Sequence, residues 1–404
     1  MEDVFPFSFP VSASLLSLLS ILLFLVDVAL DVWAIVALYQ EGEYVYMGVL
    51  IALLLASSIL MQVFSWIWYS EPGKEMETSI DKFADKYNLI GPLHVFQLGV
   101  FLRCASLVEI SICKLVQINS YQEGVAVMLK HDLSILRLFE TFSESIPQLV
   151  LMITIIMKEQ ELQLFTGFKI AASLLSVAIS VLFYHRDMRE LVPEDQNMGW
   201  LSSAVFFLWN LFLITPRVVA VALFASVLPC YIAVHFLCLW MLLFLWAWRQ
   251  KTDFMDTAGG EWLYRATVGV IWYFSWFNVA SGNTRVRGIL YHVLTGADTV
   301  LLLGLWFWRT SVESACRNPL PINPYVLTAA LPVIYITGLL LKLLYYWKFH
   351  PNCHPFRDEK PQIEFYARAA AVETDSSDAE PDAEPQLTNT GVNKRMRNMA
   401  NNFY

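Results

Sequence analysis

The chain has 404 residues, of which 57% are hydrophobic and only 16% are charged, and its formal net charge at pH 7 is −9. A soluble domain has about a quarter of its residues charged, so this composition excludes an ordinary soluble protein. The negative charge gives no indication of a nucleic-acid partner, and we expect none. Apolar runs close to the roughly 20 residues that a spanning helix needs recur along most of the chain. The sequence therefore predicts an all-α polytopic membrane protein.

The N-terminal segment MEDVFPFSFP contains no basic residue and leads into a long apolar run. A cleaved signal peptide has a basic segment and a shorter apolar core, so we predict a signal anchor that is retained. The six cysteines are scattered and lack the Cys and His spacing of a zinc site. The sequence also shows no nucleophile–base set and no phosphate-binding loop. We therefore expect a protein that is not an enzyme and that needs no metal or other cofactor.

Ten apolar segments follow one another along the chain: 13–38, 44–69, 91–117, 133–157, 163–184, 201–225, 228–248, 263–281, 286–308 and 325–349. If all ten crossed the membrane, Lys and Arg would lie on both sides, contrary to their preference for the cytoplasm. If 91–117 and 263–281 enter and leave on the cytoplasmic side, most basic loops become cytoplasmic, and so do both termini. Re-entrant backbone at membrane depth is tolerated where protein or water surrounds it. We predict eight spanning helices and two re-entrant segments, with ten ordinary spans as the alternative.

Each half of the membrane region then has the order span, span, re-entrant segment, span, span. Residues 13–184 and 201–349 would be two parallel structural repeats, an arrangement that many transporters use. This regularity concerns the order of segments and not residue-level similarity. The repeats form a predicted transmembrane domain, residues 1–350, and a polar cytoplasmic tail follows at residues 351–404.

Charged residues occur inside or at the start of several predicted spans. Arg137, Glu140 and Glu144 are spaced three and four residues apart, so they share one face of the helix predicted at 133–157. A charge at mid-bilayer costs about 2.5–3.5 kcal/mol on insertion scales, and such residues usually mark function. The complete set is Asp27, Asp31, Asp132, Arg137, Glu140, Glu144, Arg217 and Asp298.

Among these residues, five acids lie within spans, and we count only two bases there, Arg137 and Arg217. We interpret the excess as a hydrated stripe that contacts cationic lipid head groups, with a buried ion-pair network that fixes helix packing as the alternative. Pro147 and Pro216 lie beside the charges, where they either kink the helices and open a groove or are simply tolerated. The lone histidines of the apolar helices, His235 and His292, are expected to serve packing.

After residue 349 the chain is polar, acidic and proline-containing, which is typical of a disordered linker. Asp375 and Asp378 each precede a small residue and follow an upstream acid, as caspases prefer, and an exposed linker makes such a site usable. Cys353 is either a palmitoylation site or a free thiol. The last segment predicts a basic amphipathic helix. This helix binds either anionic lipid or the cytoplasmic mouth of the membrane domain, as an autoinhibitory plug; its residues are Val392, Lys394, Arg395, Met396, Arg397, Met399 and Phe403.

Several stretches of the membrane domain resemble the XK-related family of membrane proteins. The most specific is SILRLFETFSESIPQL (134–149), supported by FLVDVALDVW (24–33), FLWNLFLITPRVVAVALF (207–224) and YFSWFNVASGNTR (273–285). The resemblance is strongest to the caspase-activated phospholipid-scrambling branch. It implies an ATP-independent plasma-membrane scramblase that exposes phosphatidylserine during apoptosis, with the charged set above as the path for membrane phospholipids. It also implies a single-span immunoglobulin-type chaperone partner of the basigin or neuroplastin kind, and it leaves a homo-oligomer open.

Two other functions fit the same residues. Buried acids and repeated segments suit an ion or solute transporter or channel, which would show current or uptake without lipid exposure. The charges would alternatively pair with a partner's helix in a non-transporting structural subunit, which would reach the cell surface without any transport activity.

Overall fold

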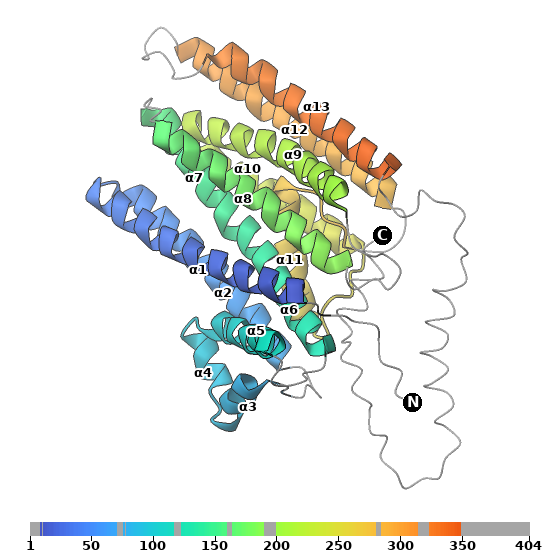
Figure 1. The fold of residues 1–404 in the computed structure, drawn as a ribbon. Helices are drawn as coiled ribbons and strands as arrows, with labels where there is room; N and C mark the ends of the chain where they lie inside the picture. Colours follow the sequence, from blue (N-terminus) through green and yellow to red (C-terminus); the bar gives the residue numbers. More distant parts are fainter. Residues whose placement is uncertain are drawn as a thin grey trace.

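The computed structural model describes residues 9, 11–70, 76, 78–116, 123–159, 164–189, 199–279, 284–313 and 323–348, and this part of the chain contains helices and no strand (Figure 1). The elements are α1 (Val11–Gln40), α2 (Tyr44–Tyr69), α3 (Ser79–Lys86), α4 (Ile90–Val95), α5 (Gly99–Val116), α6 (Glu123–Glu140), the π-helical turn η1 (Thr141–Ser145), α7 (Ile146–Glu159), α8 (Leu164–Arg189), α9 (Trp200–Val227), α10 (Pro229–Arg249), α11 (Ala258–Phe274), α12 (Thr284–Glu313) and α13 (Pro324–Lys348).

Eight helical segments of the described chain are long and apolar enough to cross a membrane. They are α1, α2, the continuous run of α6, η1 and α7, and then α8, α9, α10, α12 and α13. The long helices lie roughly parallel in Figure 1, from upper left to lower right. The predicted number of spanning helices and the all-α polytopic class are confirmed.

The two segments that we predict to be re-entrant are not among these eight helices. The first is broken into α4 and α5, and Gln97 in the turn between them has a φ of 64°. Ser58 of α2 donates a hydrogen bond to the Gln97 side chain (2.6 Å), and Gln62 donates one to the Gln97 carbonyl (3.0 Å). The turn is therefore attached to α2, and α5 is seen nearly end-on in Figure 1, across the long helices.

The second of these segments, α11, ends at Phe274 and is followed by non-helical backbone at 275–279. Trp272 donates a hydrogen bond from its indole to the Phe277 carbonyl (2.6 Å), which holds this backbone against the helix. The position of both segments relative to a bilayer stays a prediction, as does the repeat relation between the two halves.

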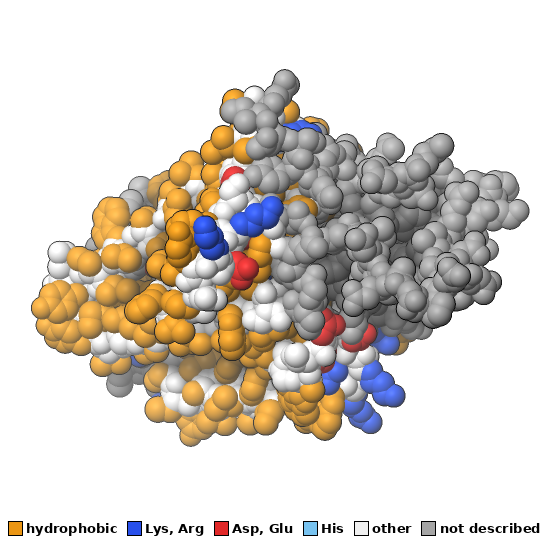
Figure 2. Space-filling model, turned by 90° about the horizontal axis from the view of Figure 1, so that it is seen from below, with side chains coloured by type: hydrophobic (Ala, Val, Ile, Leu, Met, Phe, Trp, Pro, Cys, Tyr) orange, Lys and Arg blue, Asp and Glu red, His pale blue; other side chains and the backbone are white. Residues whose placement is uncertain are grey.

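Helix α9 lies at the centre of the molecule. It packs against α7, α8, α12 and α13, and most of its side chains are buried. The small residues Ala220, Ala222 and Ala225 let neighbouring backbones approach closely. Pro216 lies inside this helix without ending it. In contrast, α1, α10 and α13 expose many leucine and valine side chains, and hydrophobic side chains cover most of the described surface in Figure 2. This outer surface suits contact with lipid tails.

The π-helical turn η1 lies in the middle of the third span, between α6 and α7. The Ile146 N–H donates to the Thr141 carbonyl, five residues earlier, and the next residue, Pro147, has no N–H to donate. The Ser143 hydroxyl bonds both the Phe139 carbonyl (2.7 Å) and the Ser57 hydroxyl of α2 (2.8 Å). Single π-turns are frequent at functional sites, and this one carries the acidic stretch.

Candidate functional site

Four of the predicted charged residues lie together between α1 and the third span, and we call Asp27, Asp31, Glu140 and Glu144 the acid cluster. Asp31 is hydrogen-bonded to Glu144 and to Gln148 of α7. Three of the four carboxyl groups are almost completely buried, with exposed fractions of 8% for Asp31, 4% for Glu140 and 6% for Glu144. The widened turn η1 thus places the carboxyl group of Glu144 next to Asp31 of α1.

Arg137 is the base of the acid cluster. It donates a hydrogen bond to Glu140 (2.8 Å) and another to the Ser20 carbonyl of α1 (3.2 Å). Its guanidinium lies over the Phe24 ring, 4.3 Å from the centroid. Its side chain is 23% exposed, whereas that of Glu140 is 5% exposed. Arg137 therefore links α6 to α1 at the more accessible edge of the cluster.

The acid cluster has more carboxyl groups than bases. Two carboxyl groups as close as those of Asp31 and Glu144 can share a proton. Four carboxyl groups lie here with one guanidinium. An uncompensated charge in an apolar region is costly. The arrangement is therefore suited to a cation or to water entering from the membrane surface.

Arg217 and Asp298 belong to a second, separate network around α9. Arg217 donates to Asp298 of α12 (2.5 Å) and to the Tyr273 carbonyl of α11 (3.0 Å). The other Asp298 oxygen lies 3.0 Å from His235 of α10, whose second ring nitrogen lies 2.9 Å from the Tyr273 hydroxyl. His235 thus packs in this network through hydrogen bonds to protein side chains. One acid and one guanidinium are matched here.

Asp132 lies in a third network, apart from the acid cluster. Arg103 of α5 donates to Asp132 (2.8 Å) and, from its other nitrogens, to the hydroxyl (2.9 Å) and carbonyl (3.0 Å) of Ser65. Both charged side chains are 0% exposed. The guanidinium also stacks on Tyr69, at 4.1 Å from the ring centroid. This geometry fixes α5 against α2 and α6.

His94 extends the Arg103 network into α4. Its ring nitrogens lie 2.6 Å from the Ile90 carbonyl and 3.0 Å from the Ser65 hydroxyl. Burial lowers the pKa of His94, and the nearby Arg103 charge acts in the same direction. A neutral imidazole that accepts from Ser65 is consistent with these contacts.

The sequence reasoning missed two bases within the membrane region. Arg103 pairs with Asp132, and Lys342 of α13 lies 2.7 Å from His292 of α12. The count of two bases against five acids within spans therefore omitted Lys342, while Arg103 lies in α5, outside the eight spanning helices. Both bases are visible in the sequence, but their partners lie on another helix, so no spacing within one helix indicates them.

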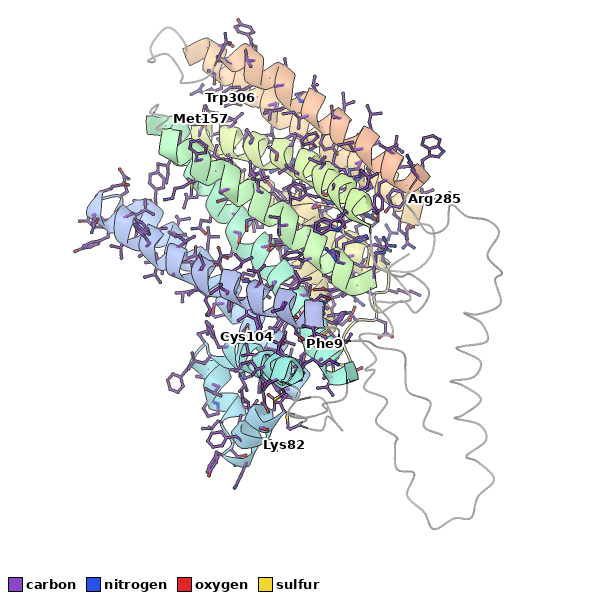
Figure 3. All side chains as sticks on the ribbon, in the orientation of Figure 1. Phe9, Lys82, Cys104, Met157, Arg285 and Trp306 are labelled. Atoms are coloured by element: carbon purple, nitrogen blue, oxygen red, sulfur yellow. The ribbon has the colours of Figure 1, made fainter. Side chains whose placement is uncertain are left out.

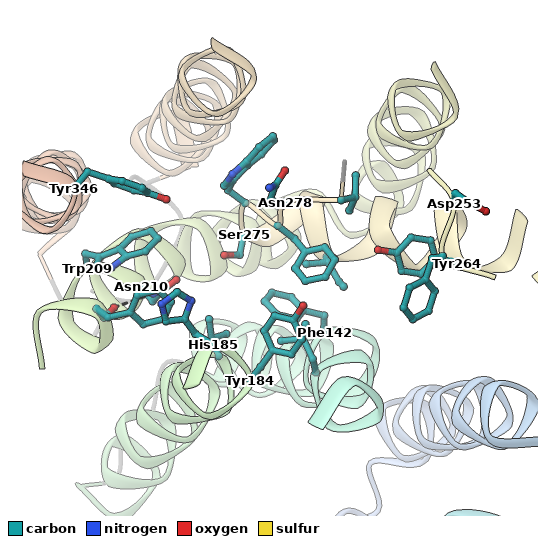
Figure 4. A pocket seen from close by; sticks show the side chains of 18 residues that line it. Phe142, Tyr184, His185, Trp209, Asn210, Asp253, Tyr264, Ser275, Asn278 and Tyr346 are labelled. Carbon is teal, nitrogen blue, oxygen red and sulfur yellow. Dashed lines mark hydrogen bonds between the residues drawn. The ribbon is translucent and has the colours of Figure 1, made fainter. Parts of the chain in front are cut away.

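A cavity of about 120 Å³ lies between α6, α8, α9, α11 and α13 (Figure 4). Its walls are mainly aromatic, and polar groups such as Asn210, Asp253 and Asn278 interrupt them. Phe142 of η1 lines this cavity, whereas Glu140 and Glu144 belong to the acid cluster. The π-turn therefore contributes to both features. Figure 3 shows the density of side chains that fills the remaining spaces between the helices.

The tail predictions fall on residues that the structure does not describe. Cys353, the two caspase-type aspartates Asp375 and Asp378, and the amphipathic segment from Val392 to Phe403 all lie outside the described residues. Among the described residues, no group of three or more His, Cys, Asp or Glu side chains could hold a metal ion.

Comparison with known proteins gives a consistent result over nearly the whole chain. The family model described as XK-related protein matches residues 15–351. XK-related protein 8 from Tetraodon nigroviridis is 41% identical, covering 96% of this chain and 95% of its own length. XK-related protein 8 from Pan troglodytes is 35% identical, covering 94% and 91%. XK-related protein 9 from Tetraodon nigroviridis is 30% identical, covering 84% and 90%.

Proposed function

Because the chain belongs to the XK-related protein family, we propose that it is an ATP-independent plasma-membrane phospholipid scramblase that exposes phosphatidylserine during apoptosis. The observation that supports this proposal most directly is the acid cluster, whose carboxyl groups outnumber its single base within spanning helices. Burial of unmatched carboxyl groups is costly unless water or a cation can reach them. Phospholipid head groups with an ammonium group supply such a cation.

In this proposal a head group moves along the acid cluster while its acyl chains stay in the surrounding lipid. The ammonium group exchanges contacts between Asp27 and Asp31 on α1 and Glu140 and Glu144 on the third span. Arg137 at the more exposed edge binds the phosphate of the same head group. The reaction breaks no covalent bond and needs no cofactor, because lipid moves down its own gradient.

The proposal also includes control by the tail. Tyr346, two residues before the end of α13, lines the aromatic cavity, so the tail starts beside it. The predicted amphipathic helix presents Val392, Met396, Met399 and Phe403 on one face, which suits an aromatic cavity. Caspase cleavage at Asp375 or Asp378 would release this plug. A single-span immunoglobulin-type chaperone of the basigin or neuroplastin kind is the proposed partner for delivery to the plasma membrane, with both termini cytoplasmic.

The test uses tail-truncated protein reconstituted in vesicles with a fluorescent phospholipid whose outward movement is read by chemical quenching. The double variant Asp31→Asn, Glu144→Gln keeps hydrogen-bonding amides but removes both acids. We expect a loss of scrambling rate of about tenfold or more, since a hydrogen bond to a charged group contributes about 1.5–3 kcal/mol. Asp85→Asn, on the exposed surface of α3, is the matched control. Unchanged lipid movement in the double variant, or ion flux without lipid movement in the parent, would refute the proposal.

A further inference from the structure

Lys342 is a basic residue within the spanning helix α13, and it has no carboxylate partner among the described residues. It is partly buried, and it forms no salt bridge with any residue that the structure describes. Its ammonium contacts His292 of α12 at 2.7 Å and lies over the Trp209 ring of α9, 4.9 Å from the centroid. Three helices therefore converge on a lysine amine that has no carboxylate partner among the described residues.

The hydrogen bonds around His292 define which atoms donate. Tyr335 donates its hydroxyl to the His292 carbonyl (3.1 Å), so the His292 Nδ1–H can donate to the same hydroxyl oxygen (3.3 Å). The Nε2 atom is then the acceptor for Lys342, because a lysine ammonium has only donors. This pattern leaves two N–H groups of Lys342 for another acceptor.

Trp209 adds a second unsatisfied donor. Its indole Nε1 is buried and has no hydrogen-bond partner within the structure, although the side chain is only 6% exposed. Buried polar groups of this kind are rare and call for an explanation. Trp209 lines both the aromatic cavity and a smaller one of about 10 Å³ that His292 and Tyr335 also line. Figure 4 shows Trp209 and Tyr346 at one end of the aromatic cavity.

We propose that Trp209, His292 and Lys342 form a binding site for the phosphate group of a phospholipid at the α9–α12–α13 end of the aromatic cavity. The smaller cavity has room for about one oxygen atom. One phosphate oxygen would enter it and accept the Trp209 N–H bond. Lys342 lines neither cavity, but it contacts His292 and Trp209, which line the smaller one. The remaining phosphate oxygens and the glycerol would lie in the larger cavity.

This inference deepens the proposed function by assigning the anionic part of the head group to the second half of the chain. The acid cluster has more carboxyl groups than bases, and the Trp209–Lys342 site has N–H donors without a carboxylate partner. A head group that combines an ammonium and a phosphate carries the complementary group for each of these two sites. The site also stands on its own observations, because a phosphate would bind there whether or not the protein moves lipid.

The test measures binding rather than lipid movement, so its outcome is distinct from that of the scrambling assay. Purified tail-truncated protein is titrated with a soluble short-chain phosphatidylcholine, with inorganic phosphate, and with a short-chain galactolipid that lacks phosphate. We expect Lys342→Gln to weaken phosphatidylcholine binding about ten- to a hundredfold, since hydrogen bonds to charged groups contribute on that order. Binding of the galactolipid should not change.

Two further variants separate the site from a general effect on folding. Trp209→Phe keeps an aromatic ring but removes an N–H that has no partner among the described residues, so it should weaken phosphatidylcholine binding severalfold and leave galactolipid binding unchanged. Lys348→Gln removes an equal charge at the exposed end of the same helix and should bind like the parent. Competition by inorganic phosphate at the same concentration would assign the site to free phosphate instead of lipid. Equal binding by the parent and Lys342→Gln, or an equal loss for the galactolipid, would overturn the proposal.

Discussion

The Arg103–Asp132 pair should control the stability of the fold, and not the movement of lipid. Both side chains are 0% exposed, so replacing Asp132 by Asn leaves the Arg103 charge buried without a counter-charge. Breaking a buried pair from one side costs about 3–5 kcal/mol. Two Arg103 bonds to Ser65 and the contact with the Tyr69 ring remain in the variant, so we expect the lower end of that range.

The assay is thermal unfolding of the detergent-purified protein. The fraction of protein that stays monodisperse after heating is measured at each temperature and gives the midpoint temperature. Asp132→Asn should lower the midpoint clearly, whereas the double variant Arg103→Met, Asp132→Leu should recover most of the loss because apolar residues can replace a buried pair. Glu140→Gln, whose partner Arg137 is partly exposed, is the comparison and should unfold nearer to the parent. The reasoning would be refuted if Asp132→Asn were as stable as the parent yet lost lipid movement selectively.

Two further substitutions test how the helices are held. Gly338→Ala should destabilise the protein by about 1–3 kcal/mol. A Cβ at this position of α13 would lie 2.9 Å from the Leu213 side chain and 3.1 Å from the Phe212 backbone. Gly304 has open space around it, so Gly304→Ala is the control in the same unfolding assay. Glu261→Gln should also destabilise by about 1–3 kcal/mol, because this carboxylate accepts the backbone N–H groups of Phe254 (2.9 Å) and Met255 (2.7 Å); protease sensitivity of the loop after α10 should rise, and an unchanged cleavage pattern would contradict this assignment.

Hydropathy and charge bias identified the spanning helices because the length and position of each helix depend on its own residues. A run of apolar side chains satisfies its backbone within one helix, so its length and position follow from local sequence. The distribution of Lys and Arg over the loops separated the 91–117 segment from the ordinary spans. It did not locate the break at Gln97, which is bound by Ser58 and Gln62 on another helix.

The polar networks could be predicted only in part. The stripe of Arg137, Glu140 and Glu144 is local, so its residues were grouped correctly, although the π-turn between them changes the face that an α-helix would give. Pro147 was the available signal for that irregularity. The partners of Asp132, Asp298 and His292 come from other helices, and a single sequence contains no information on such distant pairs. For that reason one predicted stripe became three separate networks.

The separation of these networks bears directly on function. The Arg103–Asp132 and Arg217–Asp298 pairs each match one base with one acid and join two different helices. A matched pair of this kind is explained by packing alone, and its residues need no ligand. The acid cluster and Lys342 differ, because each has charge or donors that no described side chain balances. Their signs are opposite, and they lie in different halves of the chain. Under the proposed function a zwitterionic head group would satisfy both, whereas a simple metal cation would leave the Trp209 N–H without an acceptor.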